Sequence, residues 1–229
     1  MPDTHGADRR GRVLVAAGMA VLLAATGAGL TYSRIFAADT LVVLGAVDRS
    51  RAEVLATAGL EPGVNVFHLD PSGPEAALLA DPWIAEATVE PDLPSTVTVR
   101  IVERVPVAVS GGVTVAADGT VLPGADPQGL PTIANVAGGL LDDEARTAAA
   151  TAVAALEPAQ RRSVIAVAVA TDGRLEMNLG TVLVRWGIAG ADQEKAAALA
   201  AVLRSVGAGE AMPVMVDVSV PGAPAAIFG

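Results

Sequence analysis

The fold is decided by residues 81–102, which read DPWIAEATVEPDLPSTVTVRIV. Two runs within this stretch, residues 83–89 and 96–102, are rich in β-branched side chains, and the second alternates apolar with more polar positions. Alternation with this period is typical of a strand that buries one face. The prolines of residues 91–94 interrupt the pattern and indicate a turn. The sequence therefore predicts two strands joined by a short connection.

The residues before these strands predict the rest of a small α+β domain. Residues 41–44 form a short β-branched run that is typical of a strand. Ser50 and Glu53 have the spacing of a capping box at the start of a helix, and Gly59 is placed to end that helix. A second helix is expected at residues 74–80. The order strand, helix, helix, strand, strand follows.

Aromatic side chains are few, and two of them are assigned to the core of this domain. Trp83 and Phe67 are expected to be buried there, because large aromatic rings dominate the energetics of a small core. Glu103 and Arg104 follow the last strand and are expected to form a surface ion pair. Such a pair contributes little to stability by itself.

Beyond residue 109 the sequence changes to short runs divided by turns. Asp118-Gly119 predicts a hairpin, since this dipeptide is a strong turn signal between alternating apolar residues. The further expected elements are a helix at 142–156, a three-stranded meander at 164–170, 174–179 and 181–186, a helix at 192–206 and a final strand at 213–220. In that final strand the valines at 214, 216, 218 and 220 are expected to share one face.

Near the N-terminus, residues 13–33 contain no charged side chain. A helix of this length roughly matches the ~30 Å hydrocarbon core of a bilayer. Three arginines stand directly before it, so the positive-inside tendency predicts residues 1–12 in the cytoplasm and residues 38–229 on the other side. The alternative is a signal peptide cleaved after Ala38, although the uncharged run is longer than a usual signal core.

Composition narrows the classes of function. The chain has no cysteine, so disulfides, thiolate zinc sites and a cysteine nucleophile are excluded. The formal net charge is −10, and residues 1–37, with four arginines against two aspartates, leave −12 on the remainder. An acidic surface disfavours binding to nucleic acid through phosphate neutralisation.

Candidate catalytic and metal-binding groups are sparse. His5 and His68 have no second ligand at zinc-binding spacing, and His68 is expected to be a surface or turn residue. The acidic run Asp142, Asp143 and Glu144 is explained by the preference of carboxylates for a helix N-terminus. Motifs of a nucleophile elbow and of a phosphate loop are absent from the sequence. We therefore expect neither an enzyme nor a bound metal or cofactor.

Five ordered blocks of sequence within about 60 residues are far more specific together than any one alone. They are Glu53-Val54-Leu55 with Ala58-Gly59-Leu60, Gly63-Val64-Asn65-Val66-Phe67, Asp81-Pro82-Trp83-Ile84-Ala85-Glu86-Ala87-Thr88-Val89, Pro94-Ser95-Thr96-Val97, and Val102-Glu103-Arg104-Val105-Pro106-Val107-Ala108. In content and spacing these blocks resemble the POTRA (polypeptide-transport-associated) domain of the FtsQ/DivIB family of bacterial cell division proteins. The chain departs from the family at Pro91-Asp92-Leu93, where the family usually has a basic residue and an aromatic.

The resemblance implies a domain order and a function. The expected order is a cytoplasmic tail at 1–12, a transmembrane helix at 13–33, a POTRA domain at 40–107 and a mixed, mainly antiparallel β-domain with flanking helices at 108–229. The implied function is that of a divisome scaffold in the plasma (inner) membrane at the septum. Such a scaffold links early and late division proteins and controls septal peptidoglycan synthesis by binding.

The resemblance also implies partners. These are FtsB/DivIC-like and FtsL-like membrane-anchored coiled-coil proteins, with other divisome components reaching the POTRA domain. A partner strand is expected to dock on the last strand and tail, because an edge strand has unpaired backbone groups. The residues expected to bind it are Val216, Asp217, Val218, Ser219, Val220, Ile227 and Phe228. Alternatively, the last strand only completes the sheet and the tail is disordered.

Two other functions are open at this point. One is a different membrane-anchored POTRA protein that acts in polypeptide export or envelope assembly. The other is an anchored envelope hydrolase, which would alter wall chemistry without blocking septation when it is depleted.

Overall fold

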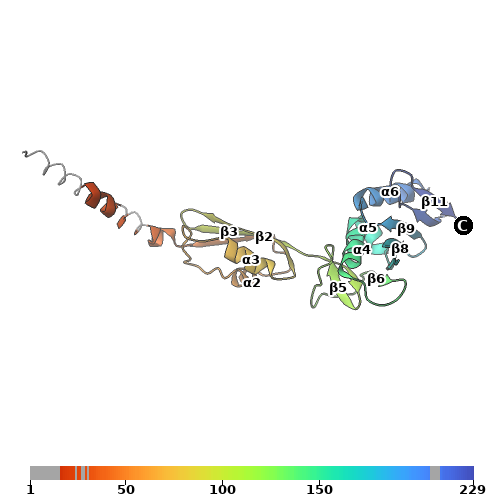
Figure 1. Ribbon diagram of the computed structural model, residues 1–229, viewed down its shortest axis with the longest axis horizontal. Helices are drawn as coiled ribbons and strands as arrows, with labels where there is room; N and C mark the ends of the chain where they lie inside the picture. Colours follow the sequence, from red (N-terminus) through yellow and green to blue (C-terminus); the bar gives the residue numbers. More distant parts are fainter. Residues whose placement is uncertain (1–15, 24, 27–28, 30, 207–211) are drawn as a thin grey trace, which may run out of the picture. The chain divides into compact units, whose positions relative to one another are not determined.

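The computed structural model describes residues 16–23, 25–26, 29, 31–206 and 212–229 (Figure 1). The chain divides into two compact units, Met1–Glu103 and Arg104–Gly229. Part of the expected transmembrane segment, including residues 13–15, lies outside the described residues. Among the residues that are described, the helices are all too short or too polar to cross a membrane.

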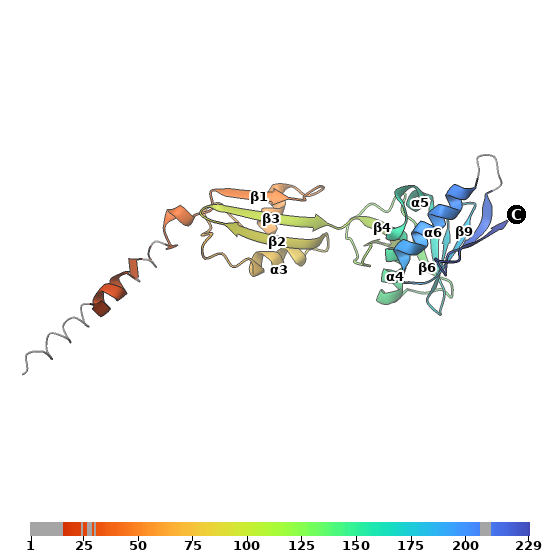
Figure 2. The ribbon, with the colours of Figure 1, turned by 90° about the horizontal axis from the view of Figure 1, so that it is seen from above.

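From residue 34 onward the first unit is a three-stranded sheet with two α-helices, and part of the segment before it, at residues 16–23 and 25–26, is helical. Its elements are a 3-10 helix η1 (Arg34–Phe36), β1 (Thr40–Leu44), α2 (Arg51–Thr57), α3 (Ser72–Leu79), β2 (Ile84–Asp92) and β3 (Thr96–Glu103). The strand β3 lies between β1 and β2, parallel to β1 and antiparallel to β2 (Figure 2). The predicted order of elements is thus confirmed, although β2 begins one residue later and ends three residues later than expected.

Local signals account for these elements. The hydroxyl of Ser50 accepts a hydrogen bond from the backbone N–H of Glu53 at 3.2 Å, and the Glu53 carboxylate accepts one from the Ser50 N–H at 2.8 Å. The predicted capping box is therefore present at the start of α2. Gly59 has a φ of +65°, the left-handed conformation that ends many helices and that glycine adopts without strain.

The expectation of an aromatic core in this unit was wrong. Phe67 is 49% exposed, and Trp83 is only partly buried. The core consists instead of aliphatic side chains from the sheet and both helices, among them Val54, Leu78 and Ile84. The residues next to the aromatics, Val66 and Ile84, are the ones that are buried in this core.

The second unit is an eight-stranded mixed sheet with helices. Its elements are β4 (Pro106–Ser110), β5 (Val113–Ala116), β6 (Thr132–Asn135), α4 (Asp143–Ala155), α5 (Pro158–Ser163), β7 (Ala166–Val169), β8 (Arg174–Asn178), β9 (Leu183–Ile188), α6 (Asp192–Ser205), β10 (Pro213–Asp217) and β11 (Ala225–Phe228). The strand order is β11-β10-β9-β8-β7-β6-β4-β5. The neighbours β4 and β6, β6 and β7, and β9 and β10 are parallel, and the other pairs are antiparallel.

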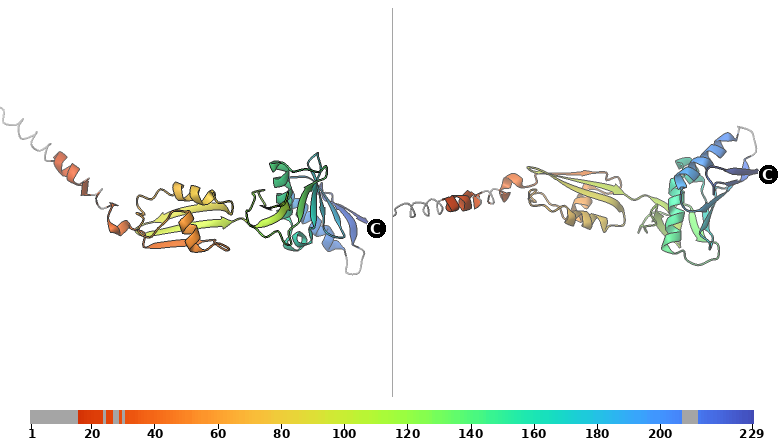
Figure 3. Two further views of the ribbon diagram at one scale, coloured as in Figure 1. Left: turned by 90° about the horizontal axis from the view of Figure 1, so that it is seen from below. Right: turned by 45° about the horizontal axis from the view of Figure 1, so that its top comes forward.

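The core of the second unit lies between the sheet and its long helices (Figure 3). Val153 of α4 and Leu199 of α6 are fully buried in one cluster with strand residues such as Met177 and Trp186. The Trp186 indole N–H donates a hydrogen bond to the Asp192 carboxylate at 2.6 Å. The predicted meander and both long helices are confirmed. The predicted alternation in β8 is also confirmed, because Leu175 and Met177 are buried while their neighbours are exposed.

Other expectations for this unit need correction. The strand β6 and the helix α5 were not predicted, and the second arm of the Asp118-Gly119 hairpin is reduced to a single bridge between Val115 and Val121. The valines of the last strand do not share one face. Val216 and Val218 are buried, but a register shift between Pro213 and Met215 turns Val214 outward, and Val220 lies beyond the strand and is exposed.

The expected surface pair of Glu103 and Arg104 is also wrong. The Glu103 carboxylate accepts hydrogen bonds from the backbone of residues 47–49 in the first unit. Arg104 instead pairs with Asp118 in the second unit, where the two side chains are 2.8 Å apart. The two neighbours point apart because successive side chains of an extended chain alternate in direction. The boundary between the units falls between these two residues.

Candidate partner interface

The two strands closest to the C-terminus form an antiparallel hairpin at one edge of the eight-stranded sheet. In this hairpin Val216 faces Ala226 and Asp217 faces Ala225. The strand β10 also pairs with β9 in parallel, so both of its edges are occupied within the chain. The edge strand is therefore β11, which the sequence analysis had treated as a tail. At this end of the sheet a partner strand can be added beside β11 but not beside β10, unless β11 itself is displaced; the strand at the opposite edge is β5.

The predicted binding residues are divided between core and surface. Val216 and Val218 are fully buried and belong to the core of the sheet. Ile227 and Phe228 are 55% and 56% exposed, and Val220 is exposed as well. The exposed residues of the predicted set are therefore available for contact with a partner. The buried valines stabilise the sheet and cannot contact a partner directly.

Asp217 and Ser219 are brought together at the end of β10. The Ser219 hydroxyl donates a hydrogen bond of 2.6 Å to the Asp217 carboxylate, and the Ser219 backbone N–H donates another of 2.9 Å. The hydroxyl bond holds the pKa of Asp217 below its usual range, with further help from the backbone bond and Arg185, although partial burial opposes the shift. Asp217 is thus anionic at neutral pH and fixes the turn that follows β10.

A ladder of charges runs from Asp217 across the neighbouring strands. Asp217 lies beside Arg185 of β9 in the parallel register, and Arg185 lies opposite Glu176 of β8. The Arg185 Nε and Glu176 Oε1 atoms are 3.6 Å apart. These three residues, together with Arg174 and Ser219, line a surface groove of about 380 Å³. The sheet therefore presents a polar face next to its apolar edge.

Exposed apolar side chains surround the C-terminal hairpin. Met212, Val214 and Val220 lie on β10 or directly beside it, and each is about half exposed or more. With Ile227 and Phe228 they form what we call the C-terminal apolar set. Sequence reasoning missed Met212, Val214 and the charge ladder, because a β-bulge and a cross-strand register cannot be read from one strand alone.

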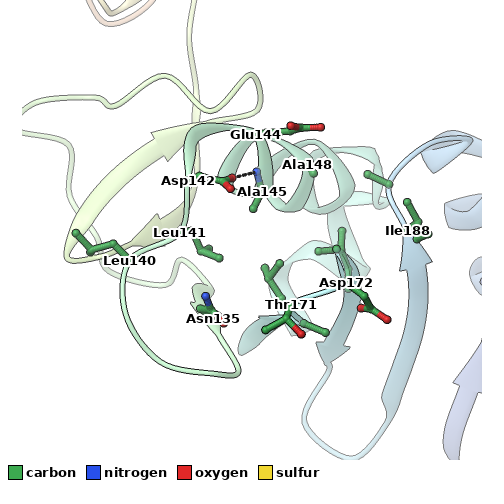
Figure 4. A pocket seen from close by; sticks show the side chains of 15 residues that line it. Asn135, Leu140, Leu141, Asp142, Glu144, Ala145, Ala148, Thr171, Asp172 and Ile188 are labelled. Carbon is green, nitrogen blue, oxygen red and sulfur yellow. Dashed lines mark hydrogen bonds between the residues drawn. The ribbon is translucent and has the colours of Figure 1, made fainter.

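A second cavity, of about 540 Å³, lies beside the start of α4 (Figure 4). Two of its carboxylates have structural roles. Asp142 accepts a hydrogen bond from the Ala145 N–H at 2.8 Å and so caps α4, as the sequence predicted for acidic residues there. Asp172 pairs with Arg174 at 2.9 Å. In the part of the chain that the structure describes, no group of three or more histidines or carboxylates is placed to hold a metal ion.

Comparison with known proteins agrees with this architecture. Residues 36–104 match the FtsQ-type POTRA domain family. The chain is 28% identical over 201 residues to the cell division protein FtsQ of Corynebacterium glutamicum, covering 82% of this chain and 87% of that protein. It is 32% identical over 199 residues to FtsQ of Mycolicibacterium smegmatis, covering 84% and 59%, and 28% identical over 200 residues to FtsQ of Mycobacteroides abscessus, covering 82% and 63%.

The first unit is therefore an FtsQ-type POTRA domain, and the chain is of the class that joins such a domain to a mixed β-domain. The resemblance to the FtsQ/DivIB family of bacterial cell division proteins is confirmed, because the similarity extends over most of the chain. Each of these relatives is named as a cell division protein. The chain spans about six tenths of the length of the second and third relatives.

Proposed function

We propose that this chain is a division scaffold that works by binding other proteins and not by catalysis. In this role it links early and late division proteins and controls septal peptidoglycan synthesis. The observation that carries the proposal is the FtsQ-type POTRA domain followed by a sheet whose edge strand, β11, is apolar and exposed. Both features suit a protein that functions by forming complexes with other proteins.

The proposed location is the plasma (inner) membrane at the division septum. The uncharged residues 13–33 serve as a single anchor, with the arginines before them on the cytoplasmic side. This topology places both folded units outside the cytoplasm, where septal wall is made. Because the chain has no cysteine, the folded units in this location are stable by packing alone, without disulfides.

The proposed partners are FtsB/DivIC-like and FtsL-like membrane-anchored proteins with coiled coils. Their docking site is the exposed edge of β11, where backbone groups accept an added strand. Ile227 and Phe228 contribute apolar contact beside this edge, and Asp217 with Ser219 fixes the turn that holds the hairpin in place. Other divisome components are proposed to contact the POTRA domain.

Capture of the FtsB-like partner by the full-length chain tests this proposal. Replacing both Ile227 and Phe228 with Asp places two charges at the edge without opening the core, since both side chains are about half exposed. We expect capture to fall at least tenfold, about 1.4 kcal/mol or more, while the thermal unfolding temperature is unchanged. Val136→Asp is the matched control, because Val136 is 69% exposed in the same unit but far from β11 in the strand order. Equal capture by the double variant and the control would place the interface elsewhere.

A further inference from the structure

Three segments of the first unit meet at one end of its sheet. The segment around η1 joins the loop at residues 64–66, because the Ala38 N–H donates to the Val64 carbonyl at 2.8 Å and the Val66 N–H donates to the Phe36 carbonyl at 2.7 Å. The turn between β2 and β3 lies at the same end, since the Asp39 N–H donates to the Ser95 carbonyl at 2.9 Å. The chain enters the domain at this end, next to the start of β1 (Figure 2).

Large apolar side chains are exposed on all three segments. Tyr32 is 74% exposed, Ile35 65%, Leu93 58% and Phe67 49%. We call these four residues the POTRA tip. They contribute neither to the core of the first unit nor to its sheet, so their exposure to water is unfavourable unless another surface covers them.

The end of the uncharged segment is fastened to the tip. The Tyr32 ring stacks on His68, with ring centroids 4.4 Å apart. His68 Nε2 lies 3.0 Å from the Thr31 hydroxyl, and the Asn65 side-chain N–H donates to the Thr31 carbonyl at 2.8 Å. These contacts join Thr31 and Tyr32, which lie near the end of the uncharged segment, to the domain. A surface that holds these two residues therefore lies close to the tip.

The charges around the tip identify the kind of surface that fits it. Arg34 is exposed on η1, but Asp39 and Asp92 are exposed beside it, so the tip carries no excess of positive charge that would select anionic lipids. Its chemistry is aromatic and aliphatic, with a phenol at one edge. Side chains of this kind are favoured at the boundary between lipid headgroups and acyl chains.

We propose that the POTRA tip is seated in the headgroup region of the bilayer, with Tyr32, Ile35, Phe67 and Leu93 in contact with lipid. This inference rests on the membrane anchor of the proposed function, because residues 13–33 lead directly into the tip. Contact with the bilayer fixes the orientation of the POTRA domain on the membrane.

A lipid-depth measurement on the full chain in phosphatidylcholine vesicles tests the inference. The chain has no cysteine, so Leu93→Cys can carry a single environment-sensitive NBD fluorophore. Val47→Cys is the matched control, because Val47 is 83% exposed and its backbone bonds to Glu103 at the opposite end of the sheet. We expect a blue-shifted emission and severalfold stronger quenching by headgroup nitroxides at position 93 than at 47. Adding Phe67→Ser should reduce the quenching at position 93.

The outcomes of this measurement distinguish failure of the seated tip from failure of the membrane anchor. If the chain floats with the vesicles and the two positions are quenched equally, the tip is not in the bilayer, although the anchor stands. If the chain fails to float with the vesicles, the anchor and the seated tip are both wrong. Quenching that appears only with anionic lipid and disappears in high salt contradicts an apolar insertion. A blue shift in detergent that grows with protein concentration shows that a second copy covers the tip instead.

Discussion

Glu103 binds the backbone of residues 47–49, and it does not form the ion pair with Arg104 that the sequence suggested. Its carboxylate accepts three backbone hydrogen bonds, from Asp48 at 2.9 Å, Val47 at 3.0 Å and Arg49 at 3.2 Å. Burial alone raises the pKa of Glu103, but these N–H donors, with the charge of Arg49, outweigh it and hold the pKa below the usual range. Glu103 thus fixes the loop between β1 and α2 to the end of β3.

Glu103→Gln should lower the stability of the first unit at pH 7 by about 1 kcal/mol, a modest value because the carboxylate is partly exposed. The pKa is lower in the folded chain than in the unfolded chain. The contribution of Glu103 is therefore complete above the unfolded value and is lost as the pH falls through the folded value. The thermal unfolding temperatures of the wild type and the variant should begin to approach each other below the unfolded pKa of 4.5, and they should coincide once the pH is below the folded pKa. A difference that stays constant down to strongly acidic pH would contradict this role.

The two tryptophans should respond differently to truncation. Trp186 is fully buried and its indole is hydrogen-bonded to Asp192, so Trp186→Ala should cost about 3–5 kcal/mol. Trp83 is only partly buried, so Trp83→Ala should cost clearly less. Denaturant unfolding followed by circular dichroism measures both costs. A larger loss for Trp83 than for Trp186 would show that the core of the first unit is aromatic after all.

At the scale of elements, the seam between β9 and the β10–β11 hairpin is held by a close backbone approach. Gly187 of β9 has a φ of +78°, and a Cβ built on it would lie 2.7 Å from the Ser219 Cβ. Val218 continues the contact, because its N–H donates to the Arg185 carbonyl at 2.9 Å. The position of the hairpin therefore depends on a residue without a side chain.

Gly187→Ala should destabilise the second unit by about 2–3 kcal/mol, because it adds a clash to the strain of a positive φ. Gly173→Ala is the control for the strain alone, since Gly173 has a φ of +79° but no atom within 4 Å of the added Cβ. The control should cost about 1 kcal/mol. Differential scanning calorimetry compares the two. Equal costs would show that the seam is loose enough to accept a methyl group.

The elements with a strong local signal were predictable from the sequence. The alternation of β8 and the capping box of α2 depend on residues close in the chain, and both are present. The helix α5 was missed because it is only six residues long, and because its first residue, Pro158, is a residue type that can either follow one helix or begin the next. The strand β6 was missed because it is four residues long and has no alternation of its own.

The candidate interface was only partly predictable, because it depends on contacts between strands that are distant in the sequence. The sequence indicated that residues 216–228 lie at the edge of a sheet, and Ile227 and Phe228 are indeed exposed there. Which strand forms the edge depends on the pairing of β10 with β11, and the direction of Val214 depends on a bulge. Both are set by contacts between strands, which local sequence does not specify.

At the scale of the whole molecule, we propose that each part of the scaffold has a separate function. These parts are the anchor, the POTRA domain and the β-domain. In this proposal the anchor restricts the chain to the membrane, the POTRA tip orients the first domain there, and β11 offers an edge to partners. Restriction to a surface raises the effective concentration of two anchored proteins for each other. A weak edge contact is therefore enough to maintain a complex that would dissociate in free solution.

The most direct test of this account is complementation of cells depleted of the protein, scored by counting septa per cell length. Depletion should give filaments without septa. The wild type and Val136→Asp should restore septation, whereas the chain with both Ile227→Asp and Phe228→Asp should not, although it is present in the membrane at the same level. Restored septation by the double variant would contradict binding through β11. Depleted cells that divide normally with altered wall chemistry would contradict a scaffold and indicate an enzyme.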